Sequence, residues 1–314
     1  MSFSLDQDAV EYLQVRRAQS ALTEVSALDP EVLREEERSL RSRYGHGPVM
    51  FREKSVDPSA GVMGHVILDP VPVPTGTLVY FHGGGWVMGE PEDYLAVCRA
   101  LAAESGWQVV VANYRKAPEH PFPAAFDDAL AVTRHIIRSG SAGRARAEER
   151  RIPFGIAGDS AGGNLAAGVA AMLPGELSVQ VLITPVLDTD LNTESYRDPQ
   201  RQLSLTRDAM QWFLDQYLPT GPRDDPRVAP LRATQFSELP ETVFVSVASD
   251  VLNSEGREYL GKLREAGIRV RHREFEGQMH GFFQLYNVMK SSKIAVSWIA
   301  DELRAVSKHC TNDH

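Results

Sequence analysis

Cysteine is scarce in this chain of 314 residues, which contains only Cys98 and Cys310. Two thiols so far apart cannot form the disulfide framework of a small secreted protein, and inside a cell such thiols are usually reduced. No run of apolar residues is long enough to cross a bilayer. The first residues, MSFSLDQDAV, also lack the basic and then apolar segments of a signal peptide. We therefore expect a soluble, cytoplasmic protein.

An excess of positive charge is missing too. The 33 Lys and Arg residues are outnumbered by 42 Asp and Glu residues, which gives a formal net charge of −9. Because nucleic acids and anionic membranes bind clustered basic side chains, we expect neither as a partner. Hydrophobic residues make up 43% of the chain, an ordinary share for a globular protein, and a chain of this length can bury one large core.

Strand-like and helix-like segments alternate after residue 50. The apolar, β-branched runs that predict strands include TGTLVYF, WQVVVANY, IPFGIAG, VQVLITPV, TVFVSVAS and VRHREF. The predicted helices lie at about 93–104, 124–139, 161–173, 255–266 and 289–306. This alternation predicts an α/β fold with a mostly parallel central sheet and helices on both of its faces.

Two regions interrupt the alternation. The first fifty residues predict helices at about 6–22 and 29–43, with Asp29 and Pro30 as the cap and first turn of the second helix. The connection at about 188–235 carries another helical piece, TRDAMQWFLDQYL, and is too long for a plain crossover. We predict that residues 1–50 and this insertion form a helical cap on a catalytic domain of residues 51–314.

The segment FGIAGDSAGGNLAAG contains the pattern Gly-x-Ser-x-Gly around Ser160. A predicted strand precedes this serine and an Ala-rich helix follows it, which is the context of a nucleophile elbow. The small residues Gly158 and Gly162 would let the strand and the helix approach closely. The helix N-terminus would favour negative charge that develops beside the serine. An ordinary glycine-rich turn can match the bare motif, but this context favours a nucleophilic serine.

Three consecutive glycines stand in VYFHGGGWVMG, where they cost backbone entropy and contribute no packing. Acyl transfer explains them, because its oxyanion is stabilised by N–H donors worth roughly 2.7–4 kcal/mol each. Such a loop supplies donors together with the residue after the nucleophile. We expect the amides of Gly83, Gly84 and Ala161 to form this oxyanion hole, and His82 to position the loop. No Lys-Ser or Lys-Thr follows at the spacing of a phosphate-binding loop.

A nucleophilic serine needs a base, and in this type of fold the histidine comes last in the chain. His280 lies in FEGQMHGFF, just past the last predicted strand and at the same end of the sheet as the elbow. His272 falls within that strand, whereas His309 and His314 belong to the C-terminal tail. We therefore predict that His280 is the base.

The carboxylate that orients the histidine should follow the preceding strand. Asp250 comes directly after TVFVSVAS, and Glu255 is its competitor five residues later. Glu255 stands at the start of a predicted helix, where a carboxylate has a capping role. We therefore predict that Asp250 is the acid of the triad.

Bulky apolar side chains stand near these motifs, in the glycine loop and in the helical insertion. The faces of amphipathic helices must be buried against something, and pockets for apolar substrates have mostly apolar walls. They could pack only on each other and on the sheet. We predict instead that four of them line the substrate pocket: Trp86, Trp212, Phe213 and Phe282.

With these motifs in place, the sequence resembles the hormone-sensitive-lipase-like family of α/β-hydrolases, in its bacterial esterase branch, over about residues 75–298. Five blocks carry the resemblance in the right order: HGGGW, YRKAPEHPFPAAFDD, GDSAGGNLA, SDVLNSEG and EGQMHGF. The resemblance implies an α/β-hydrolase fold and a serine carboxylesterase that needs no cofactor or metal. It implies the same triad of Ser160, Asp250 and His280, a small acyl ester as substrate, and a homodimer through an edge strand.

The sequence departs from the family pattern at two places. The usual Asp-Pro-Leu-Arg-Asp-Glu block reads Asp-Val-Leu-Asn-Ser-Glu from Asp250 to Glu255, so one carboxylate is replaced by Ser254. Lys116 stands where the family usually has an aliphatic residue. Neither change removes a predicted triad residue.

Two other functions remain open on the same residues. Some relatives of the family resemble deacetylases of secondary metabolites, so the scissile bond could be another ester or an amide. Plant hormone receptors that resemble the family bind a ligand without catalysis, but they lack the catalytic histidine, which is present here as His280. The resemblance and an apolar pocket together predict a preference for acyl chains of about two to eight carbons.

Overall fold

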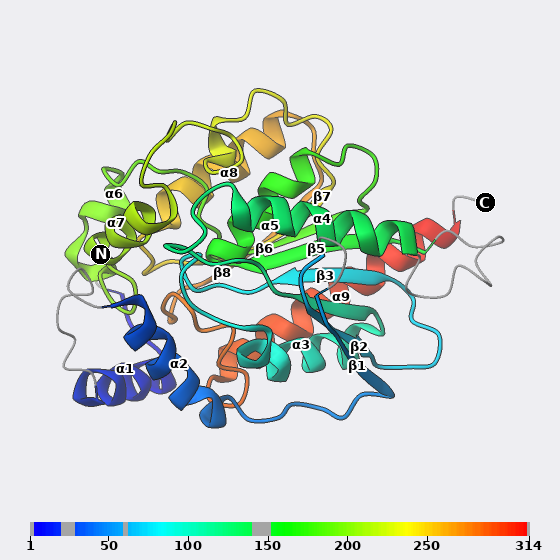
Figure 1. Cartoon of the computed structure of the whole chain (residues 1–314), viewed down its shortest axis with the longest axis horizontal. Coiled ribbons are helices and arrows are strands. Elements are labelled where there is room, and N and C mark those ends of the chain that lie inside the picture. Colours follow the sequence, from blue (N-terminus) through cyan, green and yellow to red (C-terminus); the bar gives the residue numbers. More distant parts are fainter. Residues whose placement is uncertain (1–2, 20–28, 59–61, 140–151, 313–314) are drawn as a thin grey trace.

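Figure 1 shows the computed structural model of the chain, which describes residues 3–19, 29–58, 62–139 and 152–312. Within these residues one sheet holds the strands in the order β1-β2-β4-β3-β5-β6-β7-β8. β1 (Arg52–Val56) and β2 (His65–Asp69) pair antiparallel at one edge, and from β4 onward every pair is parallel. The parallel strands are β3 (Thr77–Phe81), β4 (Gln108–Ala112), β5 (Phe154–Asp159), β6 (Val179–Ile183), β7 (Glu241–Val247) and β8 (Val270–Phe275).

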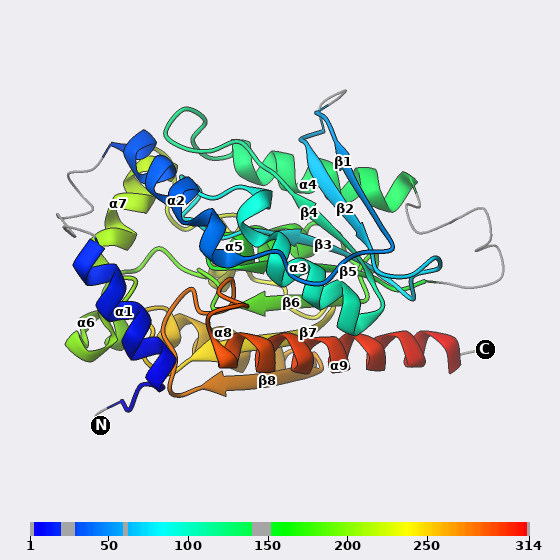
Figure 2. The ribbon, with the colours of Figure 1, turned by 90° about the horizontal axis from the view of Figure 1, so that it is seen from below.

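Helices cover both faces of the sheet, as the alternation predicted. α3 (Pro91–Ser105) and α9 (Lys290–Asn312) pack on one face (Figure 2). α4 (Ala124–Ser139), α5 (Ala161–Ala171) and α8 (Asn253–Glu265) lie on the other face. The central strands are buried on both sides, because their side chains alternate between two separate apolar clusters, one under each layer of helices. The α/β-hydrolase fold is therefore confirmed.

The remaining helices come from the N-terminal segment and from the connection between β6 and β7. They are α1 (Gln7–Gln19), α2 (Pro30–Tyr44), α6 (Glu194–Arg197), α7 (Arg207–Tyr217) and the 3₁₀ turns η3 (Pro199–Arg201) and η4 (Pro230–Arg232). Helices α1, α2, α6 and α7 gather at the end of the molecule opposite the C-terminus (Figures 1 and 2). β6 and β8 point toward that end in Figure 2. Helices α1, α2, α6 and α7 therefore lie at the end of the sheet where the parallel strands end.

Local signals explain the start of α2 and the position of α1. Asp29 caps α2 by accepting the Glu31 amide at 2.7 Å, and Pro30 is the first helical residue, as expected. The predicted helix at 6–22 is confirmed up to residue 19, and its last three residues lie outside the described part of the chain. Leu13 packs α1 against an apolar cluster that includes Met279, next to His280.

The described residues include no helix that has both the length and the apolar character needed to span a membrane. Cys98 is buried in α3 as a free thiol, and the side chain of Cys310 lies outside the described residues.

Candidate functional site: a Ser-His-Asp chain beside a glycine loop

Ser160 occupies a sharp turn between β5 and α5. Its backbone has φ 53° and ψ −120°, a left-handed conformation that is uncommon for a residue with a side chain. The flanking glycines allow the close approach that this turn needs. A Cβ atom on Gly158 would collide with the backbone of Gly162, and one on Gly162 would collide with the Phe81 carbonyl. The predicted nucleophile elbow is therefore present.

The structure brings the three predicted triad residues together in one hydrogen-bonded chain. His280 Nε2 lies 2.9 Å from Ser160 Oγ, and His280 Nδ1 lies 2.8 Å from Asp250 Oδ2. Asp250 is buried, and its Oδ1 accepts the Leu252 amide at 3.0 Å, so the carboxylate is held from both sides. This geometry can carry a proton from the serine oxygen to the imidazole.

The environment of His280 acts on its pKa in two opposing directions. Burial lowers the pKa of the imidazole, because a charged ring is poorly solvated there. The negative charge and hydrogen bond of Asp250, with a further contribution from Asp159, act the other way, and in sum the pKa lies above its usual value of 6.5. Asp250 therefore favours the imidazolium that forms when the histidine accepts a proton.

Glu255 is not a helix cap, which corrects the role expected for it. Its side chain is buried, and its Oε1 accepts the amide of Leu187, in the loop after β6, at 2.7 Å. Burial raises the pKa of Glu255 well above its usual value. Position along the sequence suggested a cap, but the side chain points into the protein and links α8 to the end of β6.

The three amides expected to form the oxyanion hole differ in their hydrogen bonding. The amide of Gly83 donates to Asp159 Oδ1 at 3.0 Å, so it is engaged within the protein. Within the described residues, no group accepts a hydrogen bond from the amides of Gly84, Gly85 and Ala161. Gly84 and Gly85 have φ values of 111° and 59°, which favour glycine. Gly85, which was not among the expected donors, therefore presents an unengaged amide beside that of Gly84.

The glycines are bare because the protein itself packs against them. A Cβ atom on Gly83 would meet Asp159, one on Gly84 would meet the carbonyl of Met88, and one on Gly85 would meet the ring of Phe213. These contacts show that the loop is tightly enclosed. The same contacts hold its amides in place.

Asp159, the residue before Ser160, braces this loop. Its Oδ1 accepts the Tyr80 hydroxyl at 2.8 Å in addition to the Gly83 amide, and its Oδ2 accepts the Tyr94 hydroxyl at 3.2 Å. Burial raises the pKa of Asp159 to about 6, although these hydrogen bonds and His280 act in the opposite direction. Asp159 thus connects the nucleophile turn to the glycine loop through hydrogen bonds.

His82 is a buried structural residue, as predicted. Its Nδ1 lies 2.7 Å from the Gly83 carbonyl oxygen, and its ring stacks on Tyr114 with centroids 4.3 Å apart. Burial, with the nearby positive charge of Lys116, lowers the pKa of His82 to about 3. The ring is therefore neutral and supports the loop.

The four predicted pocket residues do not form one group. Trp212 and Phe213 on α7 keep 8% of their surface exposed, with ring centroids 5.3 Å apart, and Phe213 packs against Gly85. Trp86 is completely buried and stacks on Tyr217, at the end of α7, with ring centroids 4.3 Å apart. Phe282 packs in the other core, under α3 and α9, and is not brought to the group. Its position two residues after His280 in the sequence did not reveal that its side chain packs under α3 and α9.

Two N-terminal carboxylates contact the loop that carries His280, and the sequence analysis missed them. Asp6 Oδ2 accepts Gln278 Nε2 at 2.8 Å and Ser291 Oγ at 3.0 Å, and the Asp6 amide donates to the Gly277 carbonyl at 2.8 Å. Asp8 Oδ2 accepts the amide of Lys290, at the start of α9, at 2.8 Å. No sequence pattern relates positions 6 and 278, so only the fold reveals this contact.

Among the described residues, no group of three or more His, Cys, Asp or Glu side chains is arranged to hold a metal ion.

Comparison with known proteins places this geometry in a family. The chain matches the α/β-hydrolase fold family over residues 78–284, which include all three residues of the hydrogen-bonded chain. The carboxylic ester hydrolase LipN of Mycobacterium tuberculosis is 35% identical over 243 residues, which span 74% of this chain and 63% of LipN. The ethyl acetate hydrolase of Pseudomonas putida is 29% identical over 295 residues, covering 91% of this chain and 86% of that protein.

A solved structure extends the similarity to the whole fold. The ester-hydrolase EH1AB1 from the metagenome of Lake Arreo, in complex with a bipyridine phosphonate derivative, superimposes with a TM-score of 0.85 at 30% identity. The match covers 96% of this chain and 98% of that chain. By its fold, its sequence and its relatives, the chain belongs to the hormone-sensitive-lipase-like family of α/β-hydrolases.

Proposed function

We propose that this α/β-hydrolase is a serine carboxylesterase that cleaves short- to medium-chain acyl esters through an acyl-enzyme. The observation that carries the proposal is the chain from Ser160 Oγ through His280 to Asp250, with links of 2.9 and 2.8 Å, on a strained elbow at the start of α5. The names of the relatives, which include a carboxylic ester hydrolase and an ethyl acetate hydrolase, support the choice of an ester.

In the first half of the reaction, Ser160 Oγ attacks the ester carbonyl carbon and its proton passes to His280 Nε2. The carbonyl oxygen becomes an oxyanion, which accepts hydrogen bonds from the amides of Gly84, Gly85 and Ala161. When the oxyanion collapses, the bond to the alcohol oxygen breaks and His280 returns the proton to that oxygen. Asp250 stabilises the imidazolium in the meantime and keeps the ring in the correct tautomer.

In the second half, a water molecule takes the place of the alcohol. His280 accepts a proton from this water, whose oxygen attacks the acyl carbon. The second oxyanion collapses with release of the carboxylic acid, and Ser160 recovers its proton. Over the four steps, one ester and one water are consumed, one alcohol and one carboxylic acid are released, and the enzyme returns to its starting state.

Hydrolysis of p-nitrophenyl esters by the wild type and by Ser160→Ala tests the proposal. The variant should lose roughly 10⁶-fold in kcat, the loss that follows removal of a nucleophilic serine elsewhere. A fluorophosphonate should label the wild type and leave the variant unlabelled. Matched amide substrates distinguish an esterase from an amide deacylase. Activity of Ser160→Ala at the wild-type level would contradict the mechanism.

The size of the acyl group is a finer part of the proposal. On α7, Phe213 stands against Gly85 of the glycine loop, and Trp212 packs on Phe213. We expect these bulky side chains to limit the room for a long acyl chain. We expect kcat/KM to be highest for acyl groups of about two to eight carbons. A maximum at twelve carbons or more in a series of p-nitrophenyl esters would show that the pocket is a long open channel.

We also propose that the chain forms a homodimer through an edge strand. β8 is the last strand of the sheet, so one of its edges has no neighbouring strand among the described residues. Exposed strand edges favour pairing with another chain. We expect twice the chain mass in light scattering coupled to gel filtration, and a monomer mass at micromolar concentration would contradict the dimer.

A further inference from the structure

We propose that Arg34, on α2, is a positioning residue that holds the glycine loop in the geometry required for oxyanion binding. The inference rests on the proposed esterase function and adds a residue from outside the motifs.

All five N–H groups of Arg34 have an acceptor. Nε donates to the carbonyl oxygen of Val87 at 2.9 Å, and Nη2 donates to that of Ala117 at 2.9 Å. The remaining donors reach both oxygens of Glu119, at 2.9 and 2.7 Å, and Glu31 Oε2 at 3.3 Å. A guanidinium has five donors in a fixed plane, so this site uses its complete capacity.

The two carbonyl groups belong to segments that enclose the glycine loop. The amides of Val87 and Met88 both donate to the Gly84 carbonyl, at 3.1 and 2.8 Å, so Val87 lies in the turn that closes the loop. The Ala117 amide donates to the Trp86 carbonyl at 3.0 Å. Arg34 therefore joins two segments that are already connected through Trp86.

A loop of three glycines needs such a connection. Glycine has the widest choice of backbone conformations, and ordering it costs more conformational entropy than ordering any other residue. Pre-organised donors contribute to catalysis only if they already point at the developing charge. Asp159 holds the Gly83 end of the loop, and Arg34 holds the Val87 end. The two free amides of the loop lie between these restraints.

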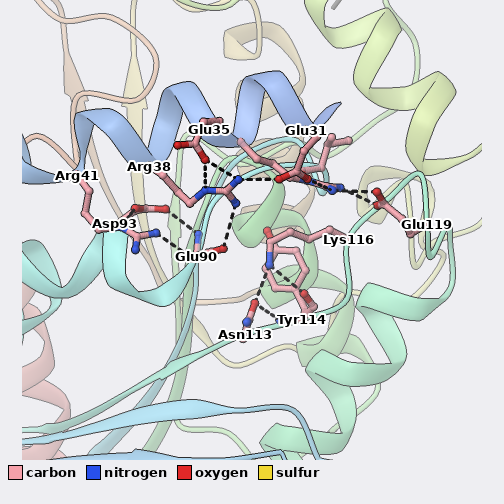
Figure 3. A network of polar contacts seen from close by, with 12 residues as sticks. Glu31, Glu35, Arg38, Arg41, Glu90, Asp93, Asn113, Tyr114, Lys116 and Glu119 are labelled. Carbon is pink, nitrogen blue, oxygen red and sulfur yellow. Dashed lines mark hydrogen bonds and ion pairs between the residues drawn. The ribbon is translucent and has the colours of Figure 1, made fainter. Parts of the chain in front are cut away.

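Arg38, one helical turn further along α2, is a matched control. Figure 3 shows it among Glu31, Glu35 and Glu90, and its partners are carboxylates only. Its side chain is 34% exposed, compared with 15% for Arg34. Replacing Arg38 removes the same charge from the same helix without touching a carbonyl of the glycine loop.

The experiment compares Arg34→Met, Arg34→Lys and Arg38→Met on a p-nitrophenyl ester, with active sites counted by fluorophosphonate titration. We expect kcat per active site to fall roughly 10- to 100-fold in both Arg34 variants, because misplaced donors lose much of their effect. Lysine cannot replace the planar fork. KM should change less than about threefold, and Arg38→Met should stay within about twofold of the wild type.

Two further measurements separate positioning from a merely structural role. A trifluoromethyl ketone forms an oxyanion adduct with Ser160, and its Ki should rise in Arg34→Met by the same factor by which kcat/KM falls. Hydrogen–deuterium exchange of the peptide spanning 82–90 should be faster in Arg34→Met than in Arg38→Met. Equal kcat and equal exchange in the two methionine variants would overturn the inference.

The outcome remains distinguishable from failure of the proposed function. Absence of ester hydrolysis in the wild type would reject the esterase, and with it the catalytic role of Arg34. Exchange of the loop would then still decide whether Arg34 orders it, because this measurement needs no substrate. Hydrolysis in the wild type, with unchanged kcat and Ki in Arg34→Met, would reject the inference alone.

Discussion

Two parts of the molecule contact the same site through different interactions. One is the carboxyl edge of the sheet, and the other is the N-terminal segment with its helices. At the sheet edge, Ser160 directly follows β5 and Asp250 lies in the turn after β7, and both side chains are buried. The N-terminal helices reach the site through charged side chains, with Asp6 at the histidine loop and Arg34 at the glycine loop.

The two parts therefore contribute differently to the site: the sheet edge places the side chains, and the N-terminal segment adjusts the loops around them. Strand pairing and apolar packing determine where the reacting groups stand, and these interactions change little with single surface substitutions. The contacts of Asp6 and Arg34 are hydrogen bonds to loops, which adjust the orientation of groups that are already nearby. Substitutions at the sheet edge should therefore abolish turnover, and substitutions in the N-terminal helices should reduce it.

Among substitutions that leave the serine in place, the largest expected effect is that of Asp250→Asn. The amide would offer an N–H to His280 Nδ1 and favour the wrong tautomer, and kcat should fall by roughly 10⁴-fold, as in serine proteases. Glu255→Gln is the matched control, because Glu255 is also a buried carboxyl near the site and a glutamine oxygen can still accept the Leu187 amide. We expect less than about a threefold change for it. The reverse order of the two variants in steady-state kinetics would identify Glu255 as the acid.

The second-largest expected effect is that of acidification on the rate of ester hydrolysis. His280 must be neutral to accept the serine proton, and its pKa lies above 6.5. The rate should therefore fall as the pH drops through this pKa, and at pH 5 it should be more than about 30-fold below the plateau. Asp250→Asn removes the charge that raises the pKa, so its residual activity should decline at a lower pH. A wild-type rate that is constant from pH 5 to 9 would exclude a histidine base.

Asp6→Ala tests the N-terminal contact with the histidine loop. The substitution removes the acceptor of Gln278 and Ser291, and we expect kcat to fall roughly three- to tenfold because His280 is held less firmly. Glu11→Ala serves as the control, since Glu11 is exposed on α1 and, among the described residues, accepts a hydrogen bond from Gln7 alone. Equal kinetics for the two variants would show that α1 is irrelevant to the histidine.

Arg41→Met should have the smallest effect on turnover. Arg41 pairs with Asp93 at 2.6 Å and with Glu90 at 2.7 Å, at the start of α3, and contacts no catalytic loop. Its removal leaves the buried Asp93 without its cation, so the free energy of unfolding should fall by roughly 1–2 kcal/mol. Urea unfolding and steady-state kinetics measure the two quantities. A tenfold loss of kcat would show that α2 acts on the site as a whole, and not through Arg34.

The sequence by itself determined the architecture, and it predicted the three side chains that form the hydrogen-bonded chain. Alternating apolar runs and helical periods are local properties, and the parallel sheet followed from them. The elbow at Ser160 was recognisable because the strand, the small residues and the helix lie within about fifteen positions. Asp250 and His280 followed from chain order and from their places directly after strands.

Only the tertiary structure decided how the surrounding groups are used. The Gly83 amide is engaged because β3 and β5 are neighbours in the sheet, which brings Asp159 to the glycine loop. Phe282 faces α3 and α9, and Glu255 is buried beside the end of β6, although each stands close in sequence to a triad residue. The contacts of Asp6 and Arg34 join positions that are far apart along the chain. Such contacts depend on the packing of distant segments, which leaves no periodic or short-range signal in the sequence.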